Sequence, residues 1–269
     1  MLNKIAIHGV PRSGTSWIGA LFDSSTNVVY RNQPLFSYAF KSFLTENSDK
    51  SQIQDYFNLL NESNDDFLLQ TEGKKNGLIP VFKKLNPTHI IYKEARYHHI
   101  LRNLLQQDEN IKVIGVIRNP KSVISSWVNA PKEFHKEKWN LREEWKGAPL
   151  KNKGLKEEFY GYNKWKEVAN LFLSLKEEYP KRFYLLNYIE LLNETEKEVK
   201  QLFNFCNLEY NSQTRDFIEK GQKIDLFKEA YSVYRINQVD DKWKVNLPIE
   251  IITEIDNDLK GTNLEKFIR

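Results

Sequence analysis

Short apolar runs alternate with stretches of helical apolar spacing along most of this chain. The apolar runs predict buried strands near residues 5–7, 27–30, 88–94, 112–117 and 182–192. Helical spacing follows several of them, and one later helix is expected to begin with a capping box formed by Thr195 and Glu198. Strands that alternate with helices predict an α/β fold, a three-layer sandwich with a central parallel sheet.

A glycine-bounded loop, residues 9–17, joins the first predicted strand to the first predicted helix. This arrangement binds phosphate because backbone N–H groups and the helix N-terminus point at one anion. The spacing nearly matches the nucleotide loop G-x-x-x-x-G-K-[ST], but Thr15 stands at the lysine position and the cation is Arg12. One arginine with the hydroxyls of Ser13, Thr15 and Ser16 suits a terminal group less charged than a triphosphate, and such a group needs no metal.

A second anion-binding motif follows the apolar run at residues 112–117. The run ends at Arg118, and Asn119 with Pro120 is the usual start of a helix, as N-cap and first helical residue. Ser126 lies two helical turns further on, so it and Arg118 can hold an anion together. A nucleotide hydrolase would need a magnesium-binding aspartate where Arg118 stands. This position therefore argues against such an enzyme.

The two motifs resemble those of sulfotransferases that use 3′-phosphoadenosine 5′-phosphosulfate (PAPS). Residues 11–17 are similar to the family's 5′-phosphosulfate loop, and the pair Arg118 and Ser126 is similar to its 3′-phosphate motif. The resemblance implies a P-loop NTPase-like sulfotransferase fold in a single domain, residues 1–269. It also implies PAPS as cosubstrate, 3′-phosphoadenosine 5′-phosphate (PAP) as product and no metal. The implied donor contacts in the first loop are Arg12, Ser13, Gly14, Thr15, Ser16 and Trp17.

Ionisable side chains follow the third predicted strand. Residues just past strand ends face the ligand crevice of such sheets, so Lys93 is expected near Arg12. The family commonly has a lysine at this place, close to the transferring group. Glu94, His98 or His99 is a candidate for the general base that deprotonates an acceptor hydroxyl. A surface helix-cap or salt-bridge role explains each of these three equally well.

The second half of the chain matches the family less closely. Tyr188 resembles the family tyrosine that lies against adenine, although a packing aromatic at a strand end explains it equally well. The family usually has a glycine-rich basic loop before a Trp-Lys pair, and this loop closes over the 3′-phosphate. Here the pair is present, but the glycines are missing and two aspartates stand in the loop. The candidate phosphate contacts at this end are Arg235, Lys242, Trp243 and Lys244.

Aromatic residues in two regions are candidates for the acceptor pocket. The first set, which serves equally well as core, is Tyr30, Phe36, Tyr38, Phe40 and Phe43. Residues 134–154 contain one proline, Pro149, and two glycines and predict a mobile connection over the active site, with Trp139 and Trp145 toward the acceptor. The acceptor class stays open among sugars, lipid-linked glycans, phenols and small alcohols.

Composition adds a few limits. The 269 residues, 40% hydrophobic, suffice for one α/β core. The net charge of +4 suits an anionic ligand and is too small to indicate nucleic acid or a membrane surface. The single cysteine, Cys206, excludes an internal disulfide and a cysteine-based metal cluster. No signal peptide is visible and no apolar run approaches the roughly 18–20 residues of a membrane span, so the cytoplasm is the expected location.

The motifs together predict an enzyme that transfers a sulfuryl group from PAPS to a hydroxyl or amine. Its acceptor would be a small molecule or glycan, such as a carbohydrate or small alcohol. Two alternatives stay open. A nucleotide-kinase-like phosphotransferase shares the strand–loop–helix geometry but needs the missing lysine and carboxylate. A non-catalytic protein that binds PAP or another nucleotide would have the same anion loops without turnover. The oligomeric state is left open.

Overall fold

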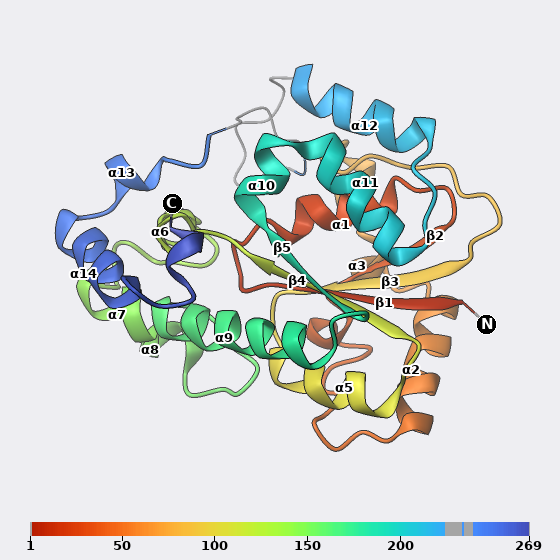
Figure 1. Ribbon diagram of the computed structural model, residues 1–269, viewed down its shortest axis with the longest axis horizontal. Coiled ribbons are helices and arrows are strands. Elements are labelled where there is room, and N and C mark those ends of the chain that lie inside the picture. The colour runs from red at the N-terminus through yellow and green to blue at the C-terminus, as the bar shows by residue number, and fades with distance from the viewer. Residues whose placement is uncertain (1, 224–232, 234–238, 269) are drawn as a thin grey trace.

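A central sheet of five parallel strands organises the molecule (Figure 1). The computed structural model describes residues 2–223, 233 and 239–268. The strand order is β2-β3-β1-β4-β5, so the first strand lies in the middle of the sheet. The strands are β1 (Asn3–His8), β2 (Val28–Asn32), β3 (His89–Glu94), β4 (Ile111–Ile117) and β5 (Phe183–Asn187). The predicted α/β fold with a parallel sheet is confirmed.

Helices cover both faces of the sheet, which explains why its strands have nearly continuous apolar runs. One face is covered by α1 (Thr15–Asp23), α10 (Tyr188–Asn193), α11 (Thr195–Cys206) and α12 (Ser212–Lys223). The other is covered by α2 (Lys50–Glu62), α5 (Leu101–Gln107) and α9 (Tyr162–Glu178). Two separate clusters of buried apolar side chains fill the spaces between these layers. The result is the three-layer sandwich.

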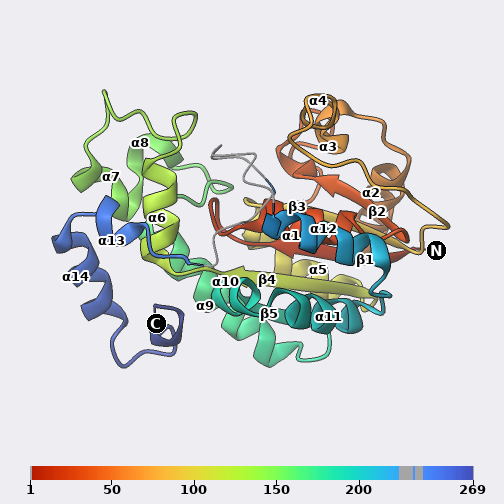
Figure 2. The same cartoon turned by 90° about the horizontal axis from the view of Figure 1, so that it is seen from above.

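A group of shorter helices gathers beyond the carboxyl ends of the strands, on the left in Figure 2. They are α6 (Pro120–Val128), α7 (Leu141–Gly147), α8 (Pro149–Asn152), α13 (Trp243–Asn246) and α14 (Ile249–Leu259). The remaining short helices are α3 (Asp66–Leu69), α4 (Thr71–Lys75), η1 (Pro34–Phe36), η2 (His98–Ile100) and η3 (Glu265–Phe267). Helices α13 and α14 both contact α6, so the end of the chain returns to the helix that follows β4.

Residues 134–154 differ from the expected mobile connection. They contain α7 and α8, and Trp145 is buried with its ring 5.7 Å from that of Tyr162 on α9. The expectation was wrong because glycine and proline here separate two short helices rather than mark an unfolded segment. The long helix α9 that follows begins at Tyr162, after Gly161 with φ of 86°.

No helix within the described residues is long and apolar enough to cross a lipid bilayer.

Candidate functional site

The loop between β1 and α1 is shaped tightly around its two glycines. Gly14 has φ of 89°, in the left-handed region that favours glycine. A Cβ atom on Gly9 would lie 2.6 Å from Ser13 Oγ and 2.9 Å from Thr15 Cγ2, so only glycine fits there. Arg12 also has a positive φ, 72°, at the crown of the loop. The predicted anion loop therefore has the tight backbone that close approach to a phosphate requires.

The loop hydroxyls have different tasks. Ser13 is fully buried, and its Oγ donates to the carbonyl of Val10 at 2.7 Å, so it braces the loop internally. Thr15 and Ser16 begin α1, where backbone N–H groups have no acceptor within the helix. The exposed Ser16 hydroxyl accepts from Lys93 Nζ at 3.4 Å. The open N–H groups and the positive end of the helix fit an anion at this point.

The end of β3 lies beside this loop, as expected. In the sheet register, Ile7 is opposite Lys93 and His8 is opposite Glu94. The amide of Gly9 donates to the carbonyl of Glu94 at 3.3 Å. Parallel pairing of neighbouring strands therefore brings Lys93 to the phosphate loop.

Glu94 has the properties of a general base. Its side chain is fully buried, and burial raises its pKa, while burial lowers the pKa of Lys93. One oxygen, Oε1, accepts from the amide of Leu35 at 2.7 Å. The other, Oε2, has no hydrogen-bond partner among the described residues. A raised pKa makes a carboxylate a stronger base, and the unpartnered oxygen keeps its capacity to accept a proton.

His98 lies among core side chains. Its Nδ1 is 3.1 Å from Nδ1 of His8, and its ring centre is 4.5 Å from that of Phe159. Desolvation, followed by the neighbouring His8 and His99, lowers its pKa well below the usual value. A lowered pKa makes an imidazole a weaker base. His99 is only partly buried and stacks on Phe159, with burial lowering its pKa too.

Arg118 links the second anion motif to the first. Its Nη1 donates to the carbonyl of Arg12 at 2.8 Å, and its guanidinium lies 4.8 Å from the ring centre of Tyr188. Its own carbonyl accepts from Trp165 Nε1 on α9 at 2.8 Å. Ser126 also reaches the first loop, because its hydroxyl accepts from Arg12 Nε at 3.1 Å. The structure thus brings the two predicted anion motifs into one site.

Tyr188 lies between the two motifs and packs against Trp17, the last residue of the first motif. Their rings meet edge to face with centres 6.0 Å apart. The Tyr188 ring also packs directly on Gly14, where any added Cβ would collide with it. The aromatic pair therefore adjoins both anion motifs, and its expected contact with adenine stays a prediction.

Two carboxylates in this site escaped the sequence analysis. Asp240 accepts two hydrogen bonds from Arg118. Burial lowers the pKa of that guanidinium, but the Asp240 hydrogen bonds and the charges of Tyr188 and Asp240 together raise it above its usual value. Glu133 Oε1 lies 3.6 Å from Nη1 of Arg12. Asp240 had a signal, since it is one of the two aspartates in the glycine-poor loop. Glu133 had none, because it is a lone acid in a segment without periodicity.

The predicted residues near the C-terminus are placed only in part. Trp243 Nε1 donates to the carbonyl of Asp240 at 3.1 Å, so α13 lies close to Arg118. Lys242 and Lys244 are exposed, and Lys244 lies 3.7 Å from Asp241. Arg235 lies outside the described residues.

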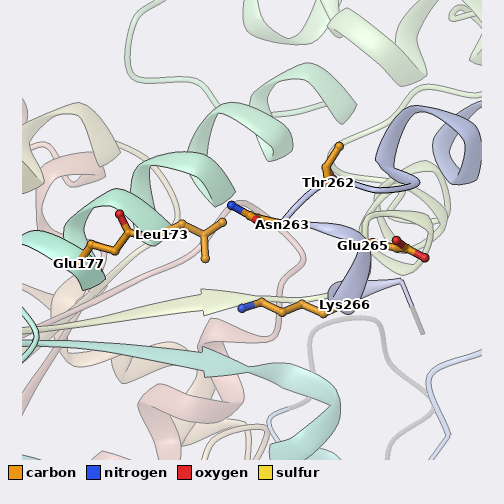
Figure 3. Close-up of a pocket in the computed structure, with 6 residues that line it drawn as sticks. All are labelled: Leu173, Glu177, Thr262, Asn263, Glu265 and Lys266. Carbon is orange, nitrogen blue, oxygen red and sulfur yellow. The ribbon is translucent and has the colours of Figure 1, made fainter.

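A hollow of about 450 Å³ lies elsewhere, between α9 and the C-terminal segment (Figure 3). Its lining contains none of the predicted site residues: Leu173, Glu177, Thr262, Asn263, Glu265 and Lys266. The geometry of the anion motifs, rather than this hollow, identifies the candidate site.

The fold is similar to that of several solved structures. The mouse sulfotransferase SULT7A1 complexed with PAP has a TM-score of 0.57 at 14% identity, covering 99% of this chain and 87% of that one. Retinol dehydratase in complex with androsterone and the inactive cofactor PAP has a TM-score of 0.55 at 14% identity, and the match covers 97% of this chain and 82% of that one. The sulfotransferase domain from the curacin biosynthetic pathway has a TM-score of 0.55 at 17% identity, and the match covers 96% of this chain and 98% of that one. No curated protein sequence matches.

At these identities the solved structures show a shared fold. The family model for the sulfotransferase domain matches residues 2–266, nearly the whole sequence. The chain therefore belongs to the sulfotransferase family, the family that its two anion motifs resemble.

Proposed function

We propose that this enzyme transfers a sulfuryl group from PAPS to a hydroxyl or amine of a small-molecule or glycan acceptor. One observation carries the proposal: two anion motifs are joined through the hydrogen bond from Arg118 to the Arg12 carbonyl, beside Lys93 and Glu94. PAPS has an anion at each end of one small molecule, so a site with two linked anion positions suits it. The PAP complexes among the similar structures support this donor.

The residues at each position fit the groups of this donor. The 5′-phosphosulfate would lie at the α1 N-terminus, with Arg12 and the N–H groups of Thr15 and Ser16. The 3′-phosphate would lie at Arg118 and Ser126. Bidentate binding of phosphate is a property of arginine, which favours Arg118 for that role. The tight loop at Gly9 and Gly14 fits a sulfate-sized group approaching the backbone.

The chemistry is an in-line displacement at sulfur. The acceptor oxygen or nitrogen forms a bond to sulfur while the bond from sulfur to the bridging oxygen of the phosphosulfate breaks. Glu94 takes the acceptor proton, and the leaving oxygen remains on the 5′-phosphate of PAP. Arg12 and Lys93 stabilise the negative charge that grows on this oxygen. The protein thus contributes position and fixed charge rather than covalent chemistry.

The acceptor is expected to approach from the side of η1. The Leu35 amide on η1 donates a hydrogen bond to Glu94. Phe36, also on η1, is exposed, and the Arg96 guanidinium lies 4.1 Å from its ring centre. Tyr38 and Phe43 are also exposed, whereas Tyr30 and Phe40 are buried in the core and drop out as acceptor contacts. Exposed aromatics beside an ion-paired arginine fit an acceptor with both apolar and polar parts, which includes carbohydrates and small alcohols.

Calorimetric titration with PAP, with ATP plus Mg²⁺ as control, is the first test. We expect PAP to bind without metal and more tightly than Mg-ATP. Transfer of radiolabelled sulfate from PAPS across a panel of alcohols, phenols, amines and sugars then identifies the acceptor. Binding of Mg-ATP without PAP would favour a phosphotransferase. PAP binding without turnover on any acceptor would favour a non-catalytic nucleotide-binding protein.

A further inference from the structure

The carboxylate of Asp240 is hydrogen-bonded to Arg118, the arginine proposed to bind the 3′-phosphate. Arg118 Nε donates to Asp240 Oδ2 at 2.9 Å, and Arg118 Nη2 donates to Asp240 Oδ1. These two bonds reproduce the bidentate geometry that a guanidinium forms with a phosphate group. The side chains are only 14% and 9% exposed, so water competes weakly for the bonds. The carboxylate therefore stands where a phosphate would bind.

The backbone at Asp240 is held in this position by two neighbours. Its carbonyl accepts from Ser122 Oγ on α6 and from Trp243 Nε1 on α13, both at 3.1 Å. The Trp243 ring in turn lies 4.3 Å from Lys121 Nζ on α6. Since the carbonyl is anchored, rotation of the Asp240 side chain can free Arg118 without moving α13.

A 3′-phosphate and the Asp240 carboxylate compete for the same N–H groups. The third donor, Nη1 of Arg118, is already bound to the carbonyl of Arg12. Two anions close together repel each other, so a phosphate gains the bidentate contact only after the carboxylate leaves. A nucleotide with a 3′-hydroxyl has no charge there and gains nothing from displacing Asp240.

We propose that Asp240 is a built-in competitor for the 3′-phosphate, one that determines how strongly this group contributes to nucleotide binding. It weakens the affinity for PAPS and for PAP, and it favours release of PAP once transfer is complete. Product release limits turnover in many enzymes, which gives such a competitor a use. The inference rests on the proposed function, because it assigns the 3′-phosphate to Arg118.

Calorimetric titration of wild type, Asp240→Asn and Asp241→Asn with PAP and with AMP tests this. Asp241 is the matched control, since it is the adjacent carboxylate but is about half exposed and lies 3.7 Å from Lys244. We expect Asp240→Asn to bind PAP about tenfold or more tightly, because a charged hydrogen-bonded competitor is gone. Its AMP affinity should stay unchanged. Asp241→Asn should change neither affinity.

Two further variants complete the design. Asp240→Ser also removes the charge and should give the same gain, which covers the case that Asp240→Asn does not fold. In an Arg118→Ala background the effect of Asp240→Asn on PAP binding should vanish, because the guanidinium for which the carboxylate and the phosphate compete is absent.

Unchanged or weaker PAP binding by Asp240→Asn and Asp240→Ser would overturn the competitor role, and so would equal tightening for AMP. In that case PAP binding by wild type would leave the proposed donor intact. If neither wild type nor any variant binds PAP, the proposed donor fails together with the competitor.

Discussion

Arg12 combines an unusual backbone with a position at the centre of the first anion loop. Its φ of 72° places a non-glycine residue in the left-handed region, which costs energy and persists only where the surroundings hold it. Its guanidinium bonds Ser126 and faces Glu133, and its carbonyl binds Arg118. One residue thus links both anion motifs through its side chain and its backbone.

We expect Arg12→Ala to lower kcat by on the order of 10²–10³-fold, because a fixed charge at the reacting group is lost. Steady-state sulfuryl transfer from PAPS measures the change. Arg142→Ala is the control, since Arg142 is an exposed cation on α7 that pairs with Glu250 at 3.3 Å. Near-normal turnover in Arg12→Ala would contradict the assigned role.

The ionisation of Glu94 and Lys93 should determine how kcat/KM depends on pH. Glu94 must be ionised to accept a proton, and burial raises its pKa, so kcat/KM should rise with pH well above the usual range of a carboxylate. Lys93 must be charged, and burial lowers its pKa, so the rate should fall again below the usual range of a lysine. A pH–rate profile of wild type should therefore be a narrow bell.

Glu94→Gln should lower kcat by on the order of 10²–10⁴-fold and remove the rising limb of that bell. His98→Asn, at the other candidate base, should keep the limb. The reverse result would make His98 the base.

At the scale of elements, the helix start at Asn119 behaves as predicted and the one at Thr195 does not. The Asn119 side chain accepts from the amide of Lys121 at 3.0 Å. Thr195 is already the first residue of α11, and the residue before it, Glu194, forms no side-chain cap. The predicted capping box was wrong because α10 ends only just before α11, so the chain has no extended residue there for a threonine cap.

This contrast yields a matched pair of variants. Asn119→Ala should lower the free energy of unfolding by about 1 kcal/mol, since the partly buried N–H group of Lys121 loses its acceptor. Thr195→Ala should cost much less, because no cap bond is lost. Urea denaturation of both variants measures the difference. Equal losses would contradict the assignment of the caps.

The same scale shows what a sequence pattern can predict here. The first four strands were predicted near their positions because buried parallel strands have unbroken apolar runs. The fifth begins as predicted, but it ends at Asn187 instead of residue 192, because the Asn187 side chain caps α10 and residues 188–192 are helical. The loops after β1, β3 and β4 were predicted because glycine, arginine and strand ends are local features. The pairing of Arg118 with Asp240 was not, since it joins residues 122 positions apart and depends on how α13 packs on α6. The helices at 134–154 were missed because their stability comes from contacts such as Trp145 with Tyr162.

At the scale of the whole molecule, two buried histidines should make stability depend on pH. Burial lowers the pKa of His8 from 6.5 to about 3, and that of His98 is also well below its usual value. In the unfolded chain these two histidines therefore bind protons near pH 6.5, whereas in the folded protein they stay neutral at that pH. Stability from these groups is complete above that pH and falls as the pH decreases toward 3.

We expect wild type to lose about 2 kcal/mol of unfolding free energy relative to His98→Asn between pH 7 and pH 5. Comparing the two proteins cancels the opposite slope from Glu94, whose raised pKa favours folding as the pH falls. Denaturant titrations at each pH give the values. If the unfolding free energies of wild type and His98→Asn change equally with pH, the pKa of His98 is not lowered in the folded protein.

The bond between η1 and Glu94 has a consequence for altering what the enzyme accepts. Burial raises the pKa of Glu94, while the charge of Lys93 and the hydrogen bond from the Leu35 amide of η1 lower it. The segment expected to touch the acceptor is therefore the same segment that adjusts the base. Exchanging these residues to admit a different acceptor would also shift the pH at which the enzyme works best. Acceptor range and pH optimum should change together in engineered variants, and selection for one should be screened for the other.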